Sequence, residues 1–154
     1  MLRDVREDDL PIFFEHQIDP DAVRMAAFPA RERDAFMTHW RTQILGNAAN
    51  GAKTVLADGK VAGNVVSWTQ DGKRLVGYWI GRGYWGNGIA TRAVSEFLTH
   101  ETTRPIYAWV AEHHIASIRV LEKCGFLRCD DPSAHAVGDH SVVELLFKLD
   151  RPGL

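Results

Sequence analysis

A glycine-rich segment joins a strand-like stretch to the most regular helical pattern in the chain. Glycines stand at positions 81, 83, 86 and 88, between the apolar run RLVGYWI and the segment IATRAV. Apolar residues at 90, 93, 94, 97 and 98 then follow the spacing of one helix face, which predicts an amphipathic helix. A plain turn needs one or two glycines, so this loop predicts backbone amides exposed at a helix start, where an anionic ligand binds well.

Two familiar phosphate-binding motifs fit this loop poorly. Gly81, Gly83 and Gly86 satisfy the GxGxxG spacing of dinucleotide-binding folds. That motif opens a strand–helix–strand unit and is followed by an acidic residue about twenty positions on, whereas this loop follows a fourth predicted strand. Glu112, which ends the next strand, comes 26 positions after Gly86. No GK[ST] follows the glycines, which excludes a P-loop and leaves a nicotinamide-binding chain as the rival enzyme class.

Two amphipathic helices are expected before the main strands. The chain opens with a short strand, and Asp8 or Asp9 can then cap a helix whose apolar face includes Ile18. A second helix is expected after Pro29, and Gly46 is its predicted end.

The central segments predict an antiparallel meander. The runs KTVLA, VAGNVVSW and RLVGYWI have strand character, with turns at 58–59 and 71–72. A strand IYAWV, a helix over about 114–124 that stops at Gly125, and a final strand SVVELLFKL follow the glycine loop and its helix. The expected fold is therefore α/β, with a mixed, mostly antiparallel sheet of six to seven strands flanked by about four helices, in one domain over 1–154.

The composition indicates an ordinary globular protein. The 154 residues match one domain, and 45% are hydrophobic and 25% charged. The net charge of −2 indicates neither a nucleic-acid nor a membrane partner. No apolar run reaches the ~20 residues of a membrane helix and no signal peptide is evident, so we expect a cytoplasmic protein. Cys124 and Cys129 are expected to be free thiols, and no metal site is predicted.

Two motifs resemble those of one enzyme family. The run YWGNGIATRAV resembles the acetyl-CoA pyrophosphate loop of the GNAT superfamily of N-acyltransferases, and HHIASIRVLEKCGF resembles the helix and strand that follow later in that superfamily. The resemblance covers about residues 1–150 and is nearest to the ribosomal-protein-alanine N-acetyltransferase branch. Trp85 stands where the superfamily has Gln or Arg, and His114 stands where the branch has Asn. The tyrosine that many members use as general acid falls at Leu121, so its role does not carry over.

The resemblance implies that acetyl-CoA is the co-substrate. Amides from Gly86 to Thr91 would bind its pyrophosphate, and the backbone at Trp79 and Ile80 would pair with the pantetheine arm like an added strand. The full set of implied cofactor-binding positions is Trp79, Ile80, Trp85, Gly86, Asn87, Gly88, Ile89, Ala90, Thr91, His114, Ser117 and Lys123.

Two residues at the start of the 114–124 helix are the catalytic candidates. Ser117 lies on the inward helix face, where its hydroxyl could donate to the leaving thiolate, although a serine there can also bond its own backbone. His114, with an ordinary pKa near ~6.5, could accept a proton from the amine or bind the cofactor arm. Glu144 in the last strand is a further candidate base, acting through water.

The predicted function is N-acetyltransfer from acetyl-CoA to a primary amine, directly, in a ternary complex. The acceptor would be a small-molecule or peptide amine, and the protein a monomer or homodimer. The non-enzymatic alternative is a catalytically silent acyl-CoA-binding sensor or scaffold.

Overall fold

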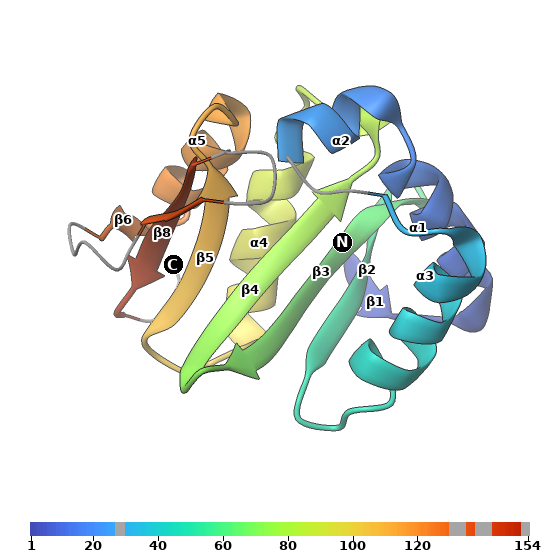
Figure 1. Cartoon of the computed structure of the whole chain (residues 1–154), viewed down its shortest axis with the longest axis horizontal. Coiled ribbons are helices and arrows are strands. Elements are labelled where there is room, and N and C mark those ends of the chain that lie inside the picture. Colours follow the sequence, from blue (N-terminus) through green and yellow to red (C-terminus); the bar gives the residue numbers. More distant parts are fainter. Residues whose placement is uncertain (27–29, 130–134, 138–142, 152–154) are drawn as a thin grey trace.

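The computed structural model describes residues 1–26, 30–129, 135–137 and 143–151. A single mixed sheet runs in the order β1-β2-β3-β4-β5-β8-β6, with β7 also paired to β8 (Figure 1). Every pairing is antiparallel except that of β4 with β5. The strands are β1 (Leu2–Asp4), β2 (Gly51–Ala57), β3 (Lys60–Gln70), β4 (Lys73–Ile80), β5 (Ile106–Ala111), β6 (Leu127–Arg128), β7 (His135–Val137) and β8 (Val143–Leu149). The predicted α/β class with a mostly antiparallel sheet is confirmed.

Helices cover both faces of this sheet. Within the described residues they are α1 (Leu10–Gln17), α2 (Pro20–Ala26), α3 (Arg33–His39), α4 (Ile89–His100) and α5 (Ile115–Lys123). Helices α1 and α3 pack on one face, and α4 and α5 pack on the other (Figure 1). Short 3₁₀ turns at Glu7–Asp9 and Arg82–Tyr84 come before α1 and α4, and a π-helical turn at Trp40–Ile44 extends α3.

Two tight hairpins build the meander of β2, β3 and β4. Asp58 and Gly59 form the first turn with φ of 51° and 77°, and Asp71 and Gly72 form the second with φ of 52° and 77°. Positive φ at both central residues defines the turn type that matches the right-handed twist of paired strands, and Asp-Gly suits it. Both predicted turns are confirmed.

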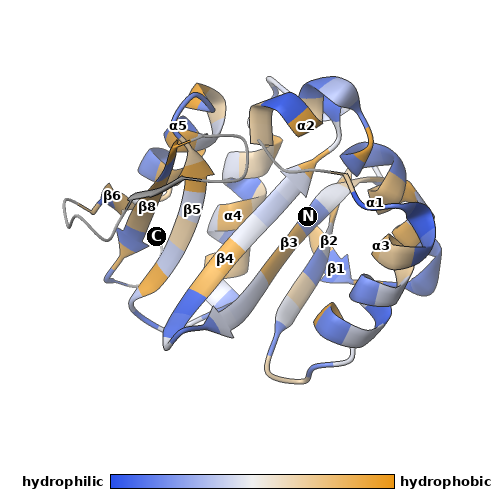
Figure 2. Cartoon of the chain, viewed as in Figure 1, coloured by the Kyte–Doolittle hydropathy of each residue, from blue (hydrophilic) through white to orange (hydrophobic). Residues whose placement is uncertain are grey.

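Two apolar clusters hold the helices to the sheet. In the first, Val94 and Phe97 of α4 pack with strand residues and are 0% and 3% exposed. In the second, Phe13 of α1 and Trp40 after α3 bring their ring centroids to 4.9 Å. Apolar and polar positions alternate around α4 (Figure 2), and the helix face predicted for it is confirmed, with Ala90 half-buried at its edge.

The N-terminal region differs from its prediction. Three α-helices rather than two come before β2 in the described chain, because Asp19 starts the separate helix α2. Its carboxylate accepts hydrogen bonds from the N–H groups of Asp21 (3.0 Å) and Ala22 (3.1 Å). Ile18 ends α1 and is 40% exposed instead of lying on its apolar face. Asp9 makes no side-chain cap to α1, because its carboxylate binds groups outside that helix.

The C-terminal region contains two short strands: β6, beside Cys129 where a short strand after the helix was expected, and β7, which the sequence pattern did not indicate. Both β6 and β7 pair with β8. Helix α5 ends before Gly125, whose φ of 94° is left-handed, as the predicted stop requires. Strand β8 is described from Val143, and Ser141 and Val142, which we assigned to the same strand, lie outside the described residues.

Candidate active site

Strands β4 and β5 are paired over only part of their length. In the described chain their parallel ladder consists of two residue pairs, the second of which joins Leu75 to Tyr107. Figure 1 shows the strands diverging beyond this point, with α4 behind them. We call the diverging ends, residues 76–80 of β4 and 108–111 of β5, the fork.

The register between β3 and β4 decides which backbone groups face the fork. The N–H of Gly81 donates to the carbonyl of Ala62 at 2.8 Å. Hydrogen-bonded pairs alternate along an antiparallel ladder, so the backbone groups of Trp79 also turn toward β3. Those of Tyr78 and Ile80 turn the other way, toward β5. The backbone at the fork is therefore that of Tyr78 and Ile80, and not that of Trp79, whose indole N–H donates to a carbonyl of α1 on one sheet face.

The loop after β4 brings the start of α4 to the fork with its first amides uncapped. Gly86 and Gly88 have φ of 83° and 72°, left-handed values that favour glycine. Gly88 is the N-cap of α4 and has no side chain to accept from the first N–H groups. The indole N–H of Trp85 donates to the carbonyl of Ile80 at 2.8 Å and so holds the loop against the end of β4. This helix start favours an anion.

The remaining predicted cofactor residues surround the same helix start. Asn87 is exposed, whereas the side chain of Ile89 is buried, which leaves only its backbone for a ligand. The end of α5 also approaches this point, because the thiol of Cys124 donates to the carbonyl of Thr91 at 3.7 Å. Lys123, the residue before that cysteine, is exposed in the last turn of α5.

The first turn of α5 contacts β4 across the fork. His114 is the N-cap of α5, and its Nδ1 accepts a hydrogen bond from the N–H of Ser117 at 3.4 Å. The hydroxyl of Ser117 lies 2.6 Å from the hydroxyl of Tyr78, which also lies 3.3 Å from the Ser117 carbonyl oxygen. Tyr78 belongs to β4 and Ser117 to α5, so this contact links the two sides of the fork.

No role for Tyr78 was predicted from the sequence. Its position two residues before Ile80 predicts a core-facing side chain, and its hydroxyl partner is 39 residues away in the chain. The only signal in the sequence was a hydroxyl group on a residue expected to face the core. A buried hydroxyl needs a hydrogen-bond partner, but the sequence does not show which residue that partner is.

The groups at the fork are uncharged at neutral pH. Burial raises the pKa of Tyr78 well above its usual 10, although its hydrogen bond with Ser117 acts in the opposite direction. Burial lowers the pKa of His114 below 6.5, and the neighbouring His113 lowers it further. Because Nδ1 of His114 accepts a hydrogen bond, we assign the single proton of the neutral ring to Nε2.

Helix α2 is tied to both sides of the fork. Arg82, in the loop after β4, binds Asp19 at 3.0 Å and Asp21 at 2.5 Å. On the β5 side, a ring nitrogen of His113 lies 2.9 Å from the carbonyl oxygen of Arg24. Helix α2 thus lies across the ends of β4 and β5 (Figure 1), and the side chains of Asp21 in α2 and of Asp19 just before it are already paired.

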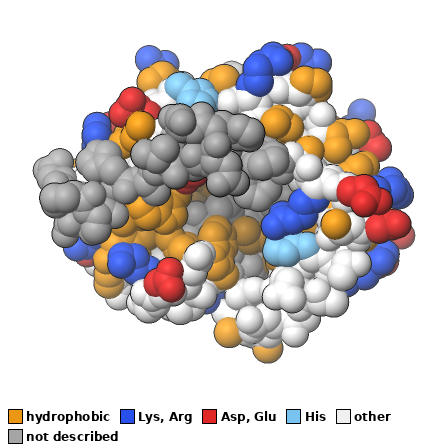
Figure 3. Space-filling model, in the orientation of Figure 1, with side chains coloured by type: hydrophobic (Ala, Val, Ile, Leu, Met, Phe, Trp, Pro, Cys, Tyr) orange, Lys and Arg blue, Asp and Glu red, His pale blue; other side chains and the backbone are white. Residues whose placement is uncertain are grey.

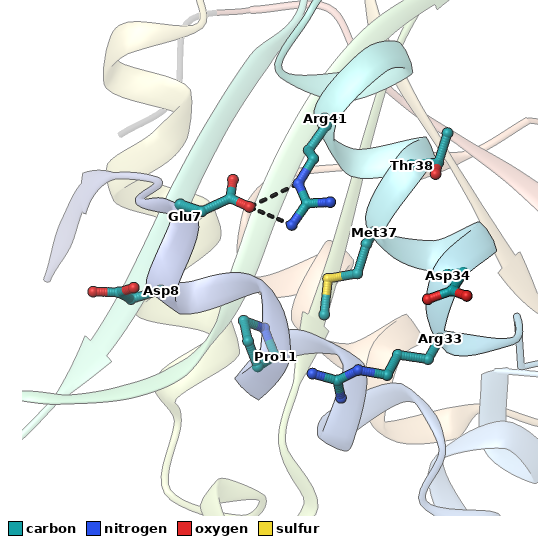
Figure 4. Close-up of a pocket in the computed structure, with 8 residues that line it drawn as sticks. All are labelled: Glu7, Asp8, Pro11, Arg33, Asp34, Met37, Thr38 and Arg41. Atoms are coloured by element: carbon teal, nitrogen blue, oxygen red, sulfur yellow. Dashed lines mark hydrogen bonds and ion pairs between the residues drawn. The ribbon is translucent and has the colours of Figure 1, made fainter.

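Two hollows lie outside the fork. The first, of about 480 Å³, lies between the start of α1 and α3, where Arg41 donates to Glu7 at 2.7 Å (Figure 4). Its lining carries both charge signs, which favours neither anions nor cations. The second, of about 610 Å³, lies beside the β2–β3 turn and the α4 start, and its lining includes Met1, Tyr84, Asn87 and Arg92.

The described part of the chain contains neither a metal-binding cluster nor a membrane-spanning helix. On the face in Figure 3, positive and negative side chains are interspersed. Among the described residues, no group of three or more His, Cys, Asp or Glu side chains is placed to hold a metal ion. None of the described helices is long and apolar enough to cross a membrane.

Comparison with known proteins identifies the family. The profile of the acetyltransferase (GNAT) domain matches residues 1–127, which is most of the chain. The chain belongs to the GNAT acetyltransferase family. This membership agrees with the fork and the glycine loop, and it excludes the nicotinamide-binding alternative. A search of curated proteins found no match.

Solved structures share the fold of this GNAT domain at low sequence identity. Aminoglycoside acetyltransferase AAC(6′)-Ib in complex with coenzyme A is 16% identical with a TM-score of 0.78, over 98% of this chain and 94% of that one. Spermidine N-acetyltransferase from Vibrio cholerae, with CoA and spermine, is 16% identical with a TM-score of 0.81, over 98% and 95%. Ribosomal-protein-alanine N-acetyltransferase from Brucella melitensis is 17% identical with a TM-score of 0.78, over 97% and 99%.

Proposed function

We propose that this GNAT domain, spanning 1–154, is an N-acetyltransferase that moves the acetyl group of acetyl-CoA to a primary amine by direct transfer in a ternary complex. The observation that carries this proposal is the fork of β4 and β5, which ends at the uncapped start of α4. A thioester with a long amide-containing arm and a diphosphate needs an unpaired strand edge beside an anion-binding helix start. Both lie together here, held by the bond from Trp85 to Ile80.

The cofactor would occupy the fork and the glycine loop in one extended pose. Its diphosphate would bind the amides from Gly86 to Thr91, with Lys123 nearby as a cation. Its pantetheine arm would pair with the backbone of Tyr78 and with the N–H of Ile80, whose carbonyl is already bonded to Trp85. An amide of β4 facing the fork would then donate to the thioester oxygen as negative charge develops on it.

Direct transfer requires little from the side chains. The neutral amine attacks the thioester carbon, the nitrogen loses a proton to water or through water to Glu144, and the C–S bond breaks with its electron pair on sulfur. Because a thiol has a pKa near ~8.5, the departing thiolate is only mildly unfavourable at neutral pH. A hydrogen bond from the hydroxyl of Ser117 would stabilise it further.

The proposed acceptor is an amine. The neighbouring structures include AAC(6′)-Ib with kanamycin and the Vibrio cholerae enzyme with spermine. For this chain we propose a small-molecule or peptide amine that enters on the α2 side, because the cofactor arm would occupy the side of α4 and α5. The cytoplasmic location and the monomer or homodimer stay predictions.

Two measurements on the full chain test this function. Calorimetry should show binding of acetyl-CoA and none of NAD, and a panel of amines should reveal at least one that releases free CoA thiol and gains an acetyl group by mass spectrometry. Tight acetyl-CoA binding without turnover of any amine would support the silent sensor or scaffold. Absence of acetyl-CoA binding would reject both.

We expect His114→Asn to retain activity within about threefold. Asparagine is a favourable helix N-cap, and its side-chain oxygen can accept the hydrogen bond from the N–H of Ser117 that Nδ1 of His114 accepts now. The ring cannot accept a proton at Nδ1 without giving up that bond, so the structure favours a capping role over that of a base. His114→Ala, which removes the cap, should lower stability by about 1 kcal/mol.

The pH profile of kcat/KM is the decisive readout for this residue, with an acceptor whose own amine titrates near ~10.4. Loss of an acidic limb in His114→Asn, with a rate at least tenfold lower, would instead make the histidine a base.

Cysteine is not expected to carry the acetyl group. Burial raises the pKa of Cys124, and its thiol lies between Ser95 (3.5 Å) and the carbonyl of Thr91 rather than in the fork. Cys124→Ala and Cys129→Ala should therefore turn over acetyl-CoA at near the original rate. Intact-protein mass spectrometry after mixing with acetyl-CoA alone checks this, because a trapped acetyl group lost in either variant would indicate a covalent mechanism.

A further inference from the structure

The hydroxyl pair of Tyr78 and Ser117 has one preferred arrangement of protons. Two acceptors lie near the phenol, the Ser117 hydroxyl oxygen at 2.6 Å and the Ser117 carbonyl oxygen at 3.3 Å. The shorter contact is the stronger bond, and a phenol is a better donor than an aliphatic alcohol. With Tyr78 as donor, the hydrogen of Ser117 is free to point elsewhere, and the fork lies beside it.

We infer that Tyr78 is a positioning residue that directs the hydroxyl hydrogen of Ser117 toward the sulfur of the leaving CoA. This inference rests on the proposed acetyltransferase function and adds a residue to it. The bond holds Ser117 against β4, the strand whose backbone would hold the cofactor arm. Tyr78 would then have two roles: its main-chain groups would face the cofactor arm in the fork, and its side-chain hydroxyl would orient the hydroxyl of Ser117.

Tyr78 would act through Ser117 and would not give up its proton. An ordinary phenol has a pKa near ~10 and a thiol one near ~8.5, so moving a proton from tyrosine to the thiolate is uphill. Burial raises the pKa of Tyr78 further and increases that cost. When the C–S bond breaks, the electron pair stays on sulfur, the Ser117 hydroxyl donates a hydrogen bond to it, and the proton that finally neutralises the thiolate comes from solvent, which has received one from the amine.

A double-mutant cycle on the full chain tests this role. Tyr78→Phe, Ser117→Ala and the double variant are assayed with acetyl-CoA and the best acceptor of the amine panel. Tyr78→Phe keeps the backbone groups and the ring, so we expect kcat to fall about tenfold with acetyl-CoA affinity unchanged within twofold. Ser117→Ala should lower kcat at least as much, and the double variant should be no slower than Ser117→Ala, because the phenol acts only through that serine.

Tyr107→Phe is the matched control. This tyrosine is also half-buried on a strand beside the fork, but its ring contacts Lys73, with the ammonium 5.8 Å from the ring centroid. Its kcat should not change. Thermal unfolding of each variant checks that the fold is kept. If Tyr78→Phe or Ser117→Ala is unstable, Ser117→Thr replaces it in the test. This variant retains a hydroxyl, so it should keep more activity than Ser117→Ala.

Three outcomes would overturn the inference. If the fall in kcat of the double variant equals the product of the two single falls, the two hydroxyls act separately. A fall in acetyl-CoA affinity with kcat unchanged would make the pair part of the cofactor site only. A Tyr78→Phe rate equal to that of Tyr107→Phe would remove the tyrosine from the reaction. If the original protein acetylates no amine, the proposed function fails, and this inference fails with it. If the original protein is active and the variants show one of these three outcomes, only the inference is rejected.

Discussion

Gly88→Val is expected to weaken acetyl-CoA binding at least tenfold, or about 1.4 kcal/mol, in a protein that still folds. Gly88 is the N-cap of α4 with φ of 72°, a conformation that a β-branched residue adopts only with strain. To relieve that strain, the chain must turn its first helical N–H groups away from the position where the diphosphate would lie. A branched Cβ would also stand in the approach of the ligand. Calorimetric titration with acetyl-CoA measures the loss.

Two other glycines separate strain from ligand contact. Gly72 has φ of 77° and open space around it in the β3–β4 hairpin, so Gly72→Val should cost similar stability without weakening acetyl-CoA binding. Gly83 lies in the glycine loop itself, has no left-handed φ and also has open space around it, so Gly83→Ala should be neutral in both respects. Unchanged acetyl-CoA affinity in a folded Gly88→Val protein would remove the α4 start from the site.

Features set by neighbouring residues were predictable from the sequence. Helix α4 follows from apolar spacing over its own length, and the hairpins follow from Asp-Gly pairs whose left-handed φ the structure shows. The resemblance of the glycine loop and of the α5 motif added the family, because both motifs depend on short runs of residues. These are local signals, and each element formed where its own sequence favours it.

Features that depend on distant residues were not predictable. The fork exists because pairing of β4 with β5 stops after Leu75, a fact about two strands whose sequences each have ordinary strand character. The β3–β4 register that turns the Tyr78 backbone away from β3 is set locally, by the two-residue turn at Asp71 and Gly72, but the sequence of β4 does not show that β5 leaves this backbone unpaired. Helix α2 was missed for a different reason, because its start signal is local: Asp19 accepts from Asp21 and Ala22, and Pro20 is the first helical residue.

Asp9→Asn is expected to lower the free energy of unfolding by about 3 kcal/mol, the range for breaking a buried ion pair. Asp9 is 3% exposed, and its carboxylate accepts two hydrogen bonds from Arg3, at 2.7 and 2.8 Å. It also accepts from the N–H of Arg6 at 2.8 Å and from the hydroxyl of Thr54 at 2.7 Å. This one group therefore joins β1 and β2 to the turn before α1. An asparagine amide would turn donors toward Arg3 and leave the guanidinium without its partner.

Asp4→Asn is the control for that loss. Asp4 also pairs with a cation, Lys53, at 2.5 Å, but its side chain is 89% exposed. Exposed ion pairs contribute roughly 0–1 kcal/mol, so the free energy of unfolding of this variant should lie within about 0.5 kcal/mol of that of the original protein. Urea unfolding followed by circular dichroism measures both variants, and equal stability of Asp9→Asn and Asp4→Asn would mean that the buried carboxylate does not hold the N-terminal region.

The pH dependence of the Asp9→Asn effect tests its cause. Burial alone would raise the pKa of Asp9, but the bonds from Arg3, Arg6 and Thr54 outweigh it and lower the pKa from 3.8 to about 2. The lowered pKa corresponds to roughly 2 kcal/mol of stability, fully present above pH ~4 and lost as the pH falls toward 2. The difference between the original protein and Asp9→Asn should therefore shrink between pH 4.5 and pH 3, because a protonated carboxyl group resembles the amide that replaces it. A difference that stays constant over this range would assign the loss to packing and not to charge.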